Sequence, residues 1–126
     1  MSDANSKKDF MNALNAIAES VYDFHDRWNL INSSKPPHEA IKEREELLLE
    51  EVRELAQEYN KNQNEISVKL LSREAADVLY VSVGSILALD KSGIAAMHQV
   101  AEKNNKKTFK TNYYNVKENK VKKLDV

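Results

Sequence analysis

The residues of this chain that could do chemistry are acids at helical spacing. Glu51 and Glu54 are three residues apart in one charged segment, and Glu74 and Asp77 are three residues apart in a second segment. Residues at this spacing share one face of a helix, so each pair can present two carboxylates in the same direction. If the two segments are antiparallel neighbouring helices, the four carboxylates can converge on a divalent cation. Mg²⁺ fits such oxygen ligands best, and Mn²⁺ can substitute for it.

Asp77 is the most informative of these acids. Val81 and Ala88 lie further along the same helical face, and their apolar side chains predict that this face points into the protein. An ionised carboxylate in apolar surroundings is unfavourable unless it is compensated, and a bound cation would compensate it. The spacing alone leaves one alternative open, a solvated acidic face in which Glu74 pairs with Arg73 or Lys69, or Asp77 pairs with Arg73.

The composition excludes several other chemistries. The 126 residues include no cysteine, which excludes a thiolate metal site, an iron–sulfur cluster and a cysteine nucleophile. A di-iron carboxylate bundle would use Glu-x-x-His pairs, and none of the three histidines stands three residues after a glutamate. The longest mostly apolar segment, residues 75–89, contains Asp77 and is too short to span a membrane. We therefore expect a cytoplasmic protein with no membrane partner.

Charge is distributed unevenly along the chain. Residues 1–102 carry 11 Lys and Arg against 18 Asp and Glu, whereas residues 103–126 carry eight Lys against two acids. An acidic body disfavours binding to a phosphate backbone, so nucleic acid is not an expected partner. We predict one domain over residues 1–107 and a Lys-rich C-terminal arm over residues 108–126, either extended or marginally helical.

The elements that must position the acids are helices. Two glycines and two prolines are too few for the turns of an all-β fold of this length. Apolar spacing predicts four helices, over about residues 9–30, 38–59 and 67–90 and from about residue 94 onward. The polar segment 32–37, which ends in two adjacent prolines, separates the first two helices. The expected fold class is therefore all-α, a four-helix bundle.

The third predicted helix also bears on assembly. From Ala75 onward it is apolar on nearly every side, which predicts a place in the middle of the bundle. Four short helices of one chain leave part of such a helix uncovered. We therefore expect self-association, as a homodimer or as a tetramer built from two dimers.

The order of the motifs resembles the MazG-like all-α nucleoside triphosphate pyrophosphohydrolases, which include the dimeric dUTPases and the phosphoribosyl-ATP pyrophosphohydrolases. The signature of that superfamily is Glu-Glu-x-x-Glu followed by Glu-x-x-Asp. Here Glu50 opens the first motif and Asp77 closes the second, with 19 residues between the motifs. Further matches are Phe24-His25, Tyr80-Val81-x-x-Gly84, Gly93-Ile94 and Asn104-x-x-Lys107. The resemblance covers about residues 20–107 and does not extend to the Lys-rich arm.

The resemblance implies an oligomeric, magnesium-dependent enzyme that cuts a (deoxy)nucleoside triphosphate between its α and β phosphates. The products would be a nucleoside monophosphate and pyrophosphate, and nucleotide-pool housecleaning would be the role. By position, the metal ligands would be Glu51, Glu54, Glu74 and Asp77. Glu50 lies beside them and is the candidate general base for the attacking water.

Basic residues after the fourth helix would hold the phosphates. Asn104 and Lys107 match the motif of the superfamily, and Lys103 lies beside them. With the metal ions on one side of the triphosphate, these residues would bind phosphate oxygens from the other side. A solvated basic helix end, which is favourable with the helix dipole, is the alternative that remains open.

Base recognition would involve the first and third helices. His25, Trp28 and Tyr80 are the candidates, through hydrogen bonding or aromatic stacking. His25 lies one position off the apolar stripe of its helix, which favours a site or surface role over a buried one. Phe24 lies on the stripe, so core packing is its expected role. Gly84, in the interior of a helix, suggests a close approach by a ligand or another helix.

A second function class stays open on the sequence. The chain could be a non-catalytic helical interaction module in which the carboxylates are surface charge. The Lys-rich arm would then bind an acidic partner or nucleic acid. The two classes differ in their response to Mg²⁺, which should stabilise only the enzyme.

Overall fold

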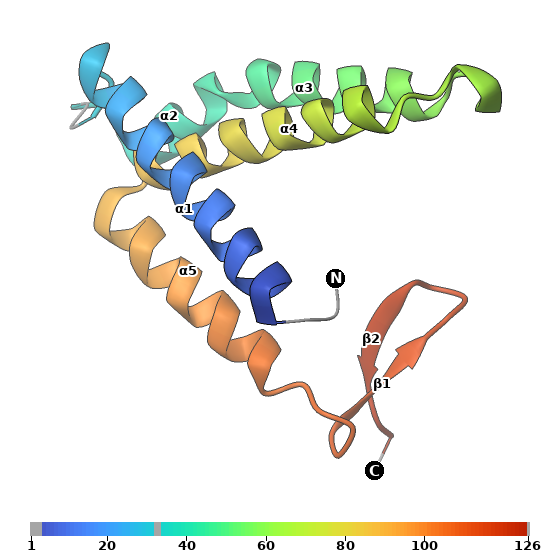
Figure 1. The fold of residues 1–126 in the computed structure, drawn as a ribbon. Coiled ribbons are helices and arrows are strands. Elements are labelled where there is room, and N and C mark those ends of the chain that lie inside the picture. Colours follow the sequence, from blue (N-terminus) through green and yellow to red (C-terminus); the bar gives the residue numbers. More distant parts are fainter. Residues whose placement is uncertain (1–3, 32–33, 126) are drawn as a thin grey trace. The chain divides into compact units, whose positions relative to one another are not determined.

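The described residues of the computed structural model are 4–31 and 34–125, and they form helices followed by one short hairpin (Figure 1). The chain divides into two compact units, Met1–Asp90 and Lys91–Val126. The elements are α1 (Ala4–Arg27), α2 (Pro37–Glu43), α3 (Glu45–Tyr59), the 3₁₀ helix η1 (Gln63–Glu65), α4 (Val68–Ala88), α5 (Asp90–Asn105), β1 (Asn112–Asn115) and β2 (Lys120–Lys123). The predicted helical class is confirmed, with the hairpin as an addition. None of the described helices is both long and apolar enough to cross a membrane.

The end of α1 follows from its sequence. The N–H of Leu30 donates to the carbonyl of His25 at 2.7 Å, and the N–H of Asn29 donates to the carbonyl of Asp26 at 3.1 Å. This pair of bonds is the Schellman arrangement, which requires a left-handed residue between them. Asn29 supplies it with φ 57°. Asparagine is one of the few residues other than glycine that adopts this conformation readily.

The two prolines of the predicted linker start the next helix. Pro36 is the N-cap of α2 and Pro37 is its first residue, where a missing N–H leaves no bond unmade. The linker residues Asn32 and Ser33 lie outside the described residues.

The helix predicted over residues 38–59 is two helices, α2 and α3, with Arg44 between them. The N–H of Arg44 donates to the carbonyl of Ile41 at 3.0 Å, a bond three residues long that tightens the turn. The Arg44 side chain then reaches α4, where Nη2 donates to the carbonyl of Val81 at 3.1 Å. The prediction of one continuous helix was therefore wrong. The sequence did not indicate the break, because neither glycine nor proline marks this position.

In the first unit, α3 and α4 lie side by side and α1 packs across α4 (Figure 1). The short connection through η1 makes α3 and α4 an antiparallel pair. Ser67 caps α4, since its hydroxyl accepts from the N–H of Leu70 at 3.3 Å. Where α1 meets α4, the Tyr80 hydroxyl donates to the Ser20 carbonyl at 3.2 Å.

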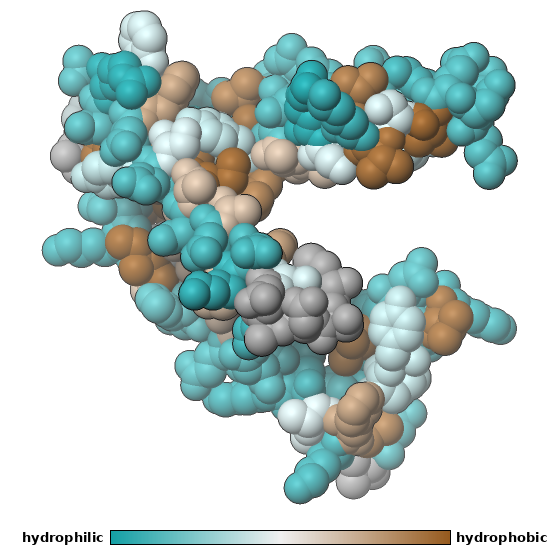
Figure 2. All heavy atoms as spheres, viewed as in Figure 1, coloured by the Kyte–Doolittle hydropathy of each residue, from teal (hydrophilic) through white to brown (hydrophobic). Residues whose placement is uncertain are grey.

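The core of the described chain is small. Val21 of α1 and Val81 of α4 are the buried hydrophobic residues among the described ones. Apolar side chains reach the surface among hydrophilic ones, as the brown spheres over α3 and α4 show (Figure 2). The larger exposed ones include Phe10, Leu14, Trp28, Leu47, Val52 and Leu79.

The second unit ends in an antiparallel hairpin. Tyr114 of β1 pairs with Val121 of β2, and Asn112 pairs with Lys123. The predicted arm is therefore extended rather than helical, but its folding back into a hairpin was missed. The turn has neither Gly nor Pro; it uses Asn119 at φ 50° instead.

Candidate metal centre

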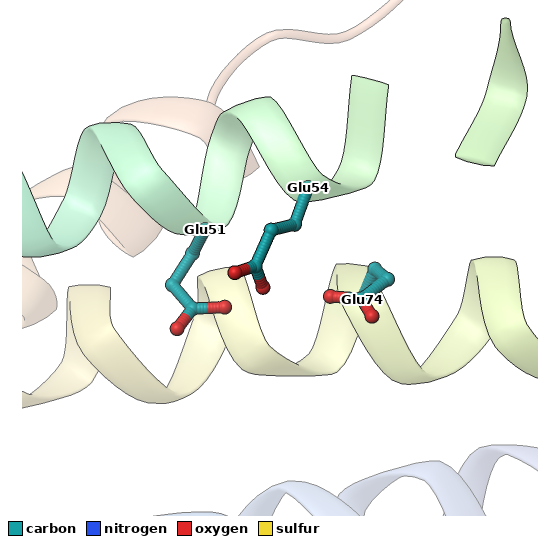
Figure 3. A group of neighbouring side chains, drawn as sticks. All are labelled: Glu51, Glu54 and Glu74. Atoms are coloured by element: carbon teal, nitrogen blue, oxygen red, sulfur yellow. The ribbon is translucent and has the colours of Figure 1, made fainter. Parts of the chain in front are cut away.

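Three of the four predicted metal ligands come together. Glu51 and Glu54 extend from α3 toward α4, and Glu74 extends from α4 (Figure 3). One carboxylate oxygen from each residue lies within 4.8 Å of the other two. The helical spacing of Glu51 and Glu54 puts both on the face that α4 covers, as the sequence indicates. We call these three residues the glutamate cluster.

The glutamate cluster is short of polar partners. Glu51 Oε2 and Glu74 Oε2 are buried, and neither has a hydrogen-bond partner among the described residues. No described Lys or Arg side chain lies within ion-pair distance of the cluster, so the pairing of Glu74 with Arg73 is not found. Buried oxygen atoms without donors normally have an explanation, and a bound ion is one of these explanations.

The proximity of the carboxylates in the glutamate cluster affects the pKa of two of them. The pKa of Glu51 is raised, first by loss of water around the carboxyl and then by the negative charges of Glu54 and Asp77. The pKa of Glu74 is raised by the same causes in the same order. Like charges at this distance disfavour ionisation, and a bound cation would reverse that effect. Carboxylate oxygens are the donors that Mg²⁺ prefers, so the residues present fit this metal.

Asp77 differs from its prediction. Its side chain is exposed, although Val81 and Gly84 on the same stripe are buried as expected. The stripe turns inward only after Asp77, so its burial was wrongly predicted. The buried oxygens of Glu51 and Glu74 carry the argument for a cation instead. Asp77 still acts on the site, because its charge contributes to the raised pKa of both residues.

Glu50 is exposed on α3, next to the cluster. Its charge adds to the repulsion that raises the pKa of Glu51. Its role as general base stays a prediction.

His25 is buried, with 6% of its surface exposed, so the expectation that it is not buried was wrong. Its role in base binding stays a prediction. Its Nδ1 lies 2.7 Å from the carbonyl of Val21, one turn earlier. A carbonyl only accepts, so Nδ1 carries the proton, and Nε2 is left to accept from Arg44 Nη1 at 3.4 Å. Both ring nitrogens of His25 therefore have partners within the protein.

The aromatic residues predicted to bind the base lie around Phe24. The ring of Phe24 is 6.4 Å from that of Trp28 and 6.3 Å from that of Tyr80. Phe24 is 42% exposed, so its predicted core position is wrong for the described chain, and Trp28 is 62% exposed. Phe24 and Tyr80 line a groove of about 360 Å³ with Ser20 and Arg27. The base-binding roles of Trp28 and Tyr80 stay predictions.

The predicted phosphate ligands belong to the second unit. Lys103 and Asn104 are in the last turn of α5, Lys107 follows it, and all three are exposed. The Asn104 amide donates to the carbonyl of Val100 at 2.9 Å, which leaves its oxygen and one N–H available. Their phosphate role stays a prediction.

Arg44 is a residue that the sequence reasoning missed. It stands seven residues before Glu51, on the same helical face, and this spacing was the available signal. Its guanidinium contacts Ser85, Val81 and His25. Gly84 makes room for it, since a Cβ at that position would overlap Arg44 Nη2 and lie 3.0 Å from the His25 ring. The close approach predicted at Gly84 is thus confirmed.

No protein-family model, no curated protein and no solved structure matches this chain.

Proposed function

We propose that this protein is a magnesium-dependent hydrolase that cleaves a (deoxy)nucleoside triphosphate to the monophosphate and pyrophosphate. The observation that carries the proposal is the glutamate cluster, in which one carboxylate oxygen of each residue lies within 4.8 Å of the other two, and no described Lys or Arg side chain forms an ion pair with it. The ordered resemblance to the MazG-like superfamily supports the choice of reaction. Nucleotide-pool housecleaning is the role that this reaction would serve.

The acidic residues of α3 and α4 would bind the metal and activate the attacking water. Glu51, Glu54 and Glu74 would hold Mg²⁺, and Asp77, one turn beyond Glu74 in the sequence, would join them. Bound Mg²⁺ supplies positive charge for phosphate oxygens and lowers the pKa of a bound water. Glu50, exposed beside the cluster, would accept a proton from the attacking water.

The phosphate-binding role of three residues near the end of α5 comes from the resemblance and stays a prediction. Lys103, Asn104 and Lys107 offer N–H donors without a carboxylate among them. They would bind the negative charge of the triphosphate and of the departing pyrophosphate. Phosphoryl transfer depends mainly on such positioning and charge stabilisation, so few other groups are required.

The decisive experiment is a substrate panel. The purified protein is incubated with Mg²⁺ and each NTP or dNTP separately, and pyrophosphate release is measured. We expect release from at least one triphosphate, and a rise in melting temperature on addition of Mg²⁺ or Mn²⁺, because the metal binds only the folded state. Release of orthophosphate, or no metal response together with no cleavage, would contradict the proposal.

One observation favours the interaction module as a second candidate. Phe109 is 99% exposed, and it lines an apolar pocket of about 360 Å³ with Lys107, Tyr113 and Val121 of the same unit. An exposed aromatic beside lysines suits contact with another molecule. A module of this kind would show neither pyrophosphate release nor stabilisation by Mg²⁺.

A further inference from the structure

Arg44 is a half-buried cation without a carboxylate partner. Burial lowers its pKa, and no neighbouring acid opposes this effect. Buried charges are normally paired, because a guanidinium taken out of water loses hydration that hydrogen bonds and a counter-charge must replace. The environment of Arg44 supplies the hydrogen bonds only in part.

The guanidinium is fixed in place by three contacts. Nε donates to Ser85 Oγ at 3.0 Å, Nη2 donates to the carbonyl of Val81 at 3.1 Å, and Nη1 donates to His25 Nε2 at 3.4 Å. A guanidinium has five N–H groups. One N–H on each Nη therefore has no partner among the described residues. The fixed fork offers donors and no acceptor.

This fork lines the largest cavity described in the first unit, about 570 Å³. Leu30, Ile31, Leu87 and Ala88 provide apolar walls. The charges at its rim include Lys35 and Glu43, which pair with each other at 2.7 Å. A cavity that combines apolar walls with a few fixed polar groups is the usual form of a small-molecule site.

Residues of the cavity or next to it are offset from the glutamate cluster by the same number of residues on α3 and on α4. Arg44 precedes Glu51 by seven residues, and Val81 follows Glu74 by seven residues. Seven residues rise about 10 Å along a helix, and α3 and α4 are antiparallel, so the offset has the same direction on both. A nucleotide whose phosphates bind at the cluster has its base displaced by a length of that order, because the sugar lies between them.

We propose that this cavity, and not the groove lined by Phe24 and Tyr80, holds the base of the substrate, and that Arg44 selects bases with a ring carbonyl. The inference rests on the proposed function and names the substrate class within it. Uracil, thymine, cytosine and guanine each present a carbonyl oxygen to an N–H donor, and guanine presents N7 beside it. Adenine has no carbonyl; its N7 can accept one N–H, but the amino group beside N7 would place a donor opposite the second free donor of Arg44. Buried donors left unpaired disfavour the adenine complex.

The first test is the relative kcat/KM for dUTP, dGTP and dATP. We expect dATP to be the poorest by about tenfold or more, the effect of roughly one unpaired buried donor. Arg44→Lys keeps the positive charge but removes the planar set of guanidinium donors. It should therefore make kcat/KM similar for dUTP, dGTP and dATP, while the stabilisation by Mg²⁺ is retained. Equal kcat/KM for dATP and dUTP in the unchanged protein overturns the inference and leaves the proposed function intact.

A second variant covers the case in which Arg44→Lys does not fold. Ala88→Leu fills the cavity without removing a partner of Arg44, and Ala13→Leu, exposed on α1, is its matched control. We expect Ala88→Leu to raise KM for every triphosphate at least tenfold with an unchanged melting response to Mg²⁺. Wild-type KM in Ala88→Leu would overturn the inference.

A third measurement separates the inference from the proposed function. Binding of dUMP, dGMP and dAMP is measured by calorimetry without any turnover. Binding of dUMP and dGMP but not dAMP supports the cavity assignment even if no triphosphate is cleaved. Equal binding of all three, or no binding of any, refutes it.

Discussion

Each carboxylate of the glutamate cluster lies next to two others. The repulsion within the cluster therefore changes when a single carboxylate is replaced by an uncharged group. Replacement of Glu54 by Gln removes one negative charge but keeps the size of the side chain. We expect this variant to lose at least 100-fold in pyrophosphate release, and its unfolding free energy without metal to stay equal or rise, because repulsion is reduced. Activity assays and urea titrations without metal measure the two effects.

The matched control is Glu46→Gln, an exposed change on α3 away from the cluster. It should leave both activity and metal response unchanged. Full activity in Glu54→Gln would remove this residue from the site.

The raised pKa of Glu51 and Glu74 predicts how stability depends on pH. A carboxyl with a raised pKa binds its proton more tightly in the folded state than in the unfolded state. Between the ordinary glutamate value, about 4.3, and the raised values, the folded state therefore holds more protons. The contribution of these two groups to stability must fall as pH rises through that window.

The measurement is the melting temperature against pH in EDTA, for the unchanged protein and for Glu74→Gln. The difference between the two curves removes the contribution of other carboxylates, and we expect the unchanged protein to lose stability relative to the variant as pH rises. Mg²⁺ should abolish that loss, because it binds the deprotonated form. A difference with the opposite slope would contradict the raised pKa.

At the scale of the elements, the Schellman end of α1 gives a clear test. Asn29 at φ 57° tolerates a conformation that a β-branched residue does not. We expect Asn29→Val to lower the unfolding free energy by about 1–2 kcal/mol. Asn29→Gly should cost nothing, and urea denaturation of both variants makes the comparison. Equal losses in the two variants would mean that backbone conformation is not the cause.

The helices that carry the cluster were predictable because their information is local. The spacing of Glu51 and Glu54 and the polar loop after α3 were enough to place three carboxylates on facing helices. Arg44 was not predictable in the same way, because the break between α2 and α3 has no sequence marker. The bonds at this break join it to residues about 40 positions later, such as Ser85 at 41 positions.

The burial of individual residues was less predictable than the helices. An apolar stripe shows which face turns inward but not where along the stripe the covering helix begins. Asp77 and Phe24 lie on predicted inward stripes and are exposed, whereas His25, one position off its stripe, is buried. Contact with a neighbouring helix, and not periodicity, decides each case.

At the scale of the whole molecule, the small core predicts self-association. Phe10 and Leu14 lie on the apolar stripe of α1 and are 57% and 42% exposed. We expect at least a dimer in sedimentation velocity at micromolar concentration, because exposed apolar surface of this kind favours association. Leu14→Glu should shift the protein toward monomer. The matched control Asn12→Glu adds the same charge to α1 without removing an apolar side chain. A monomeric unchanged protein would contradict the prediction.

Because Gly84 has no side chain, it leaves room for the Arg44 guanidinium, and a larger residue at this position would disturb the proposed selection between dUTP and dATP. An alanine there would press on the His25 ring and displace the tip of Arg44. Glu74 is about three helical turns away, so the glutamate cluster would keep its geometry. Gly84→Ala should therefore hydrolyse dATP as well as dUTP, at an unchanged Mg²⁺ requirement, which rate measurements with the two substrates can show. On the proposed function, one added methyl group would remove the discrimination between the two substrates.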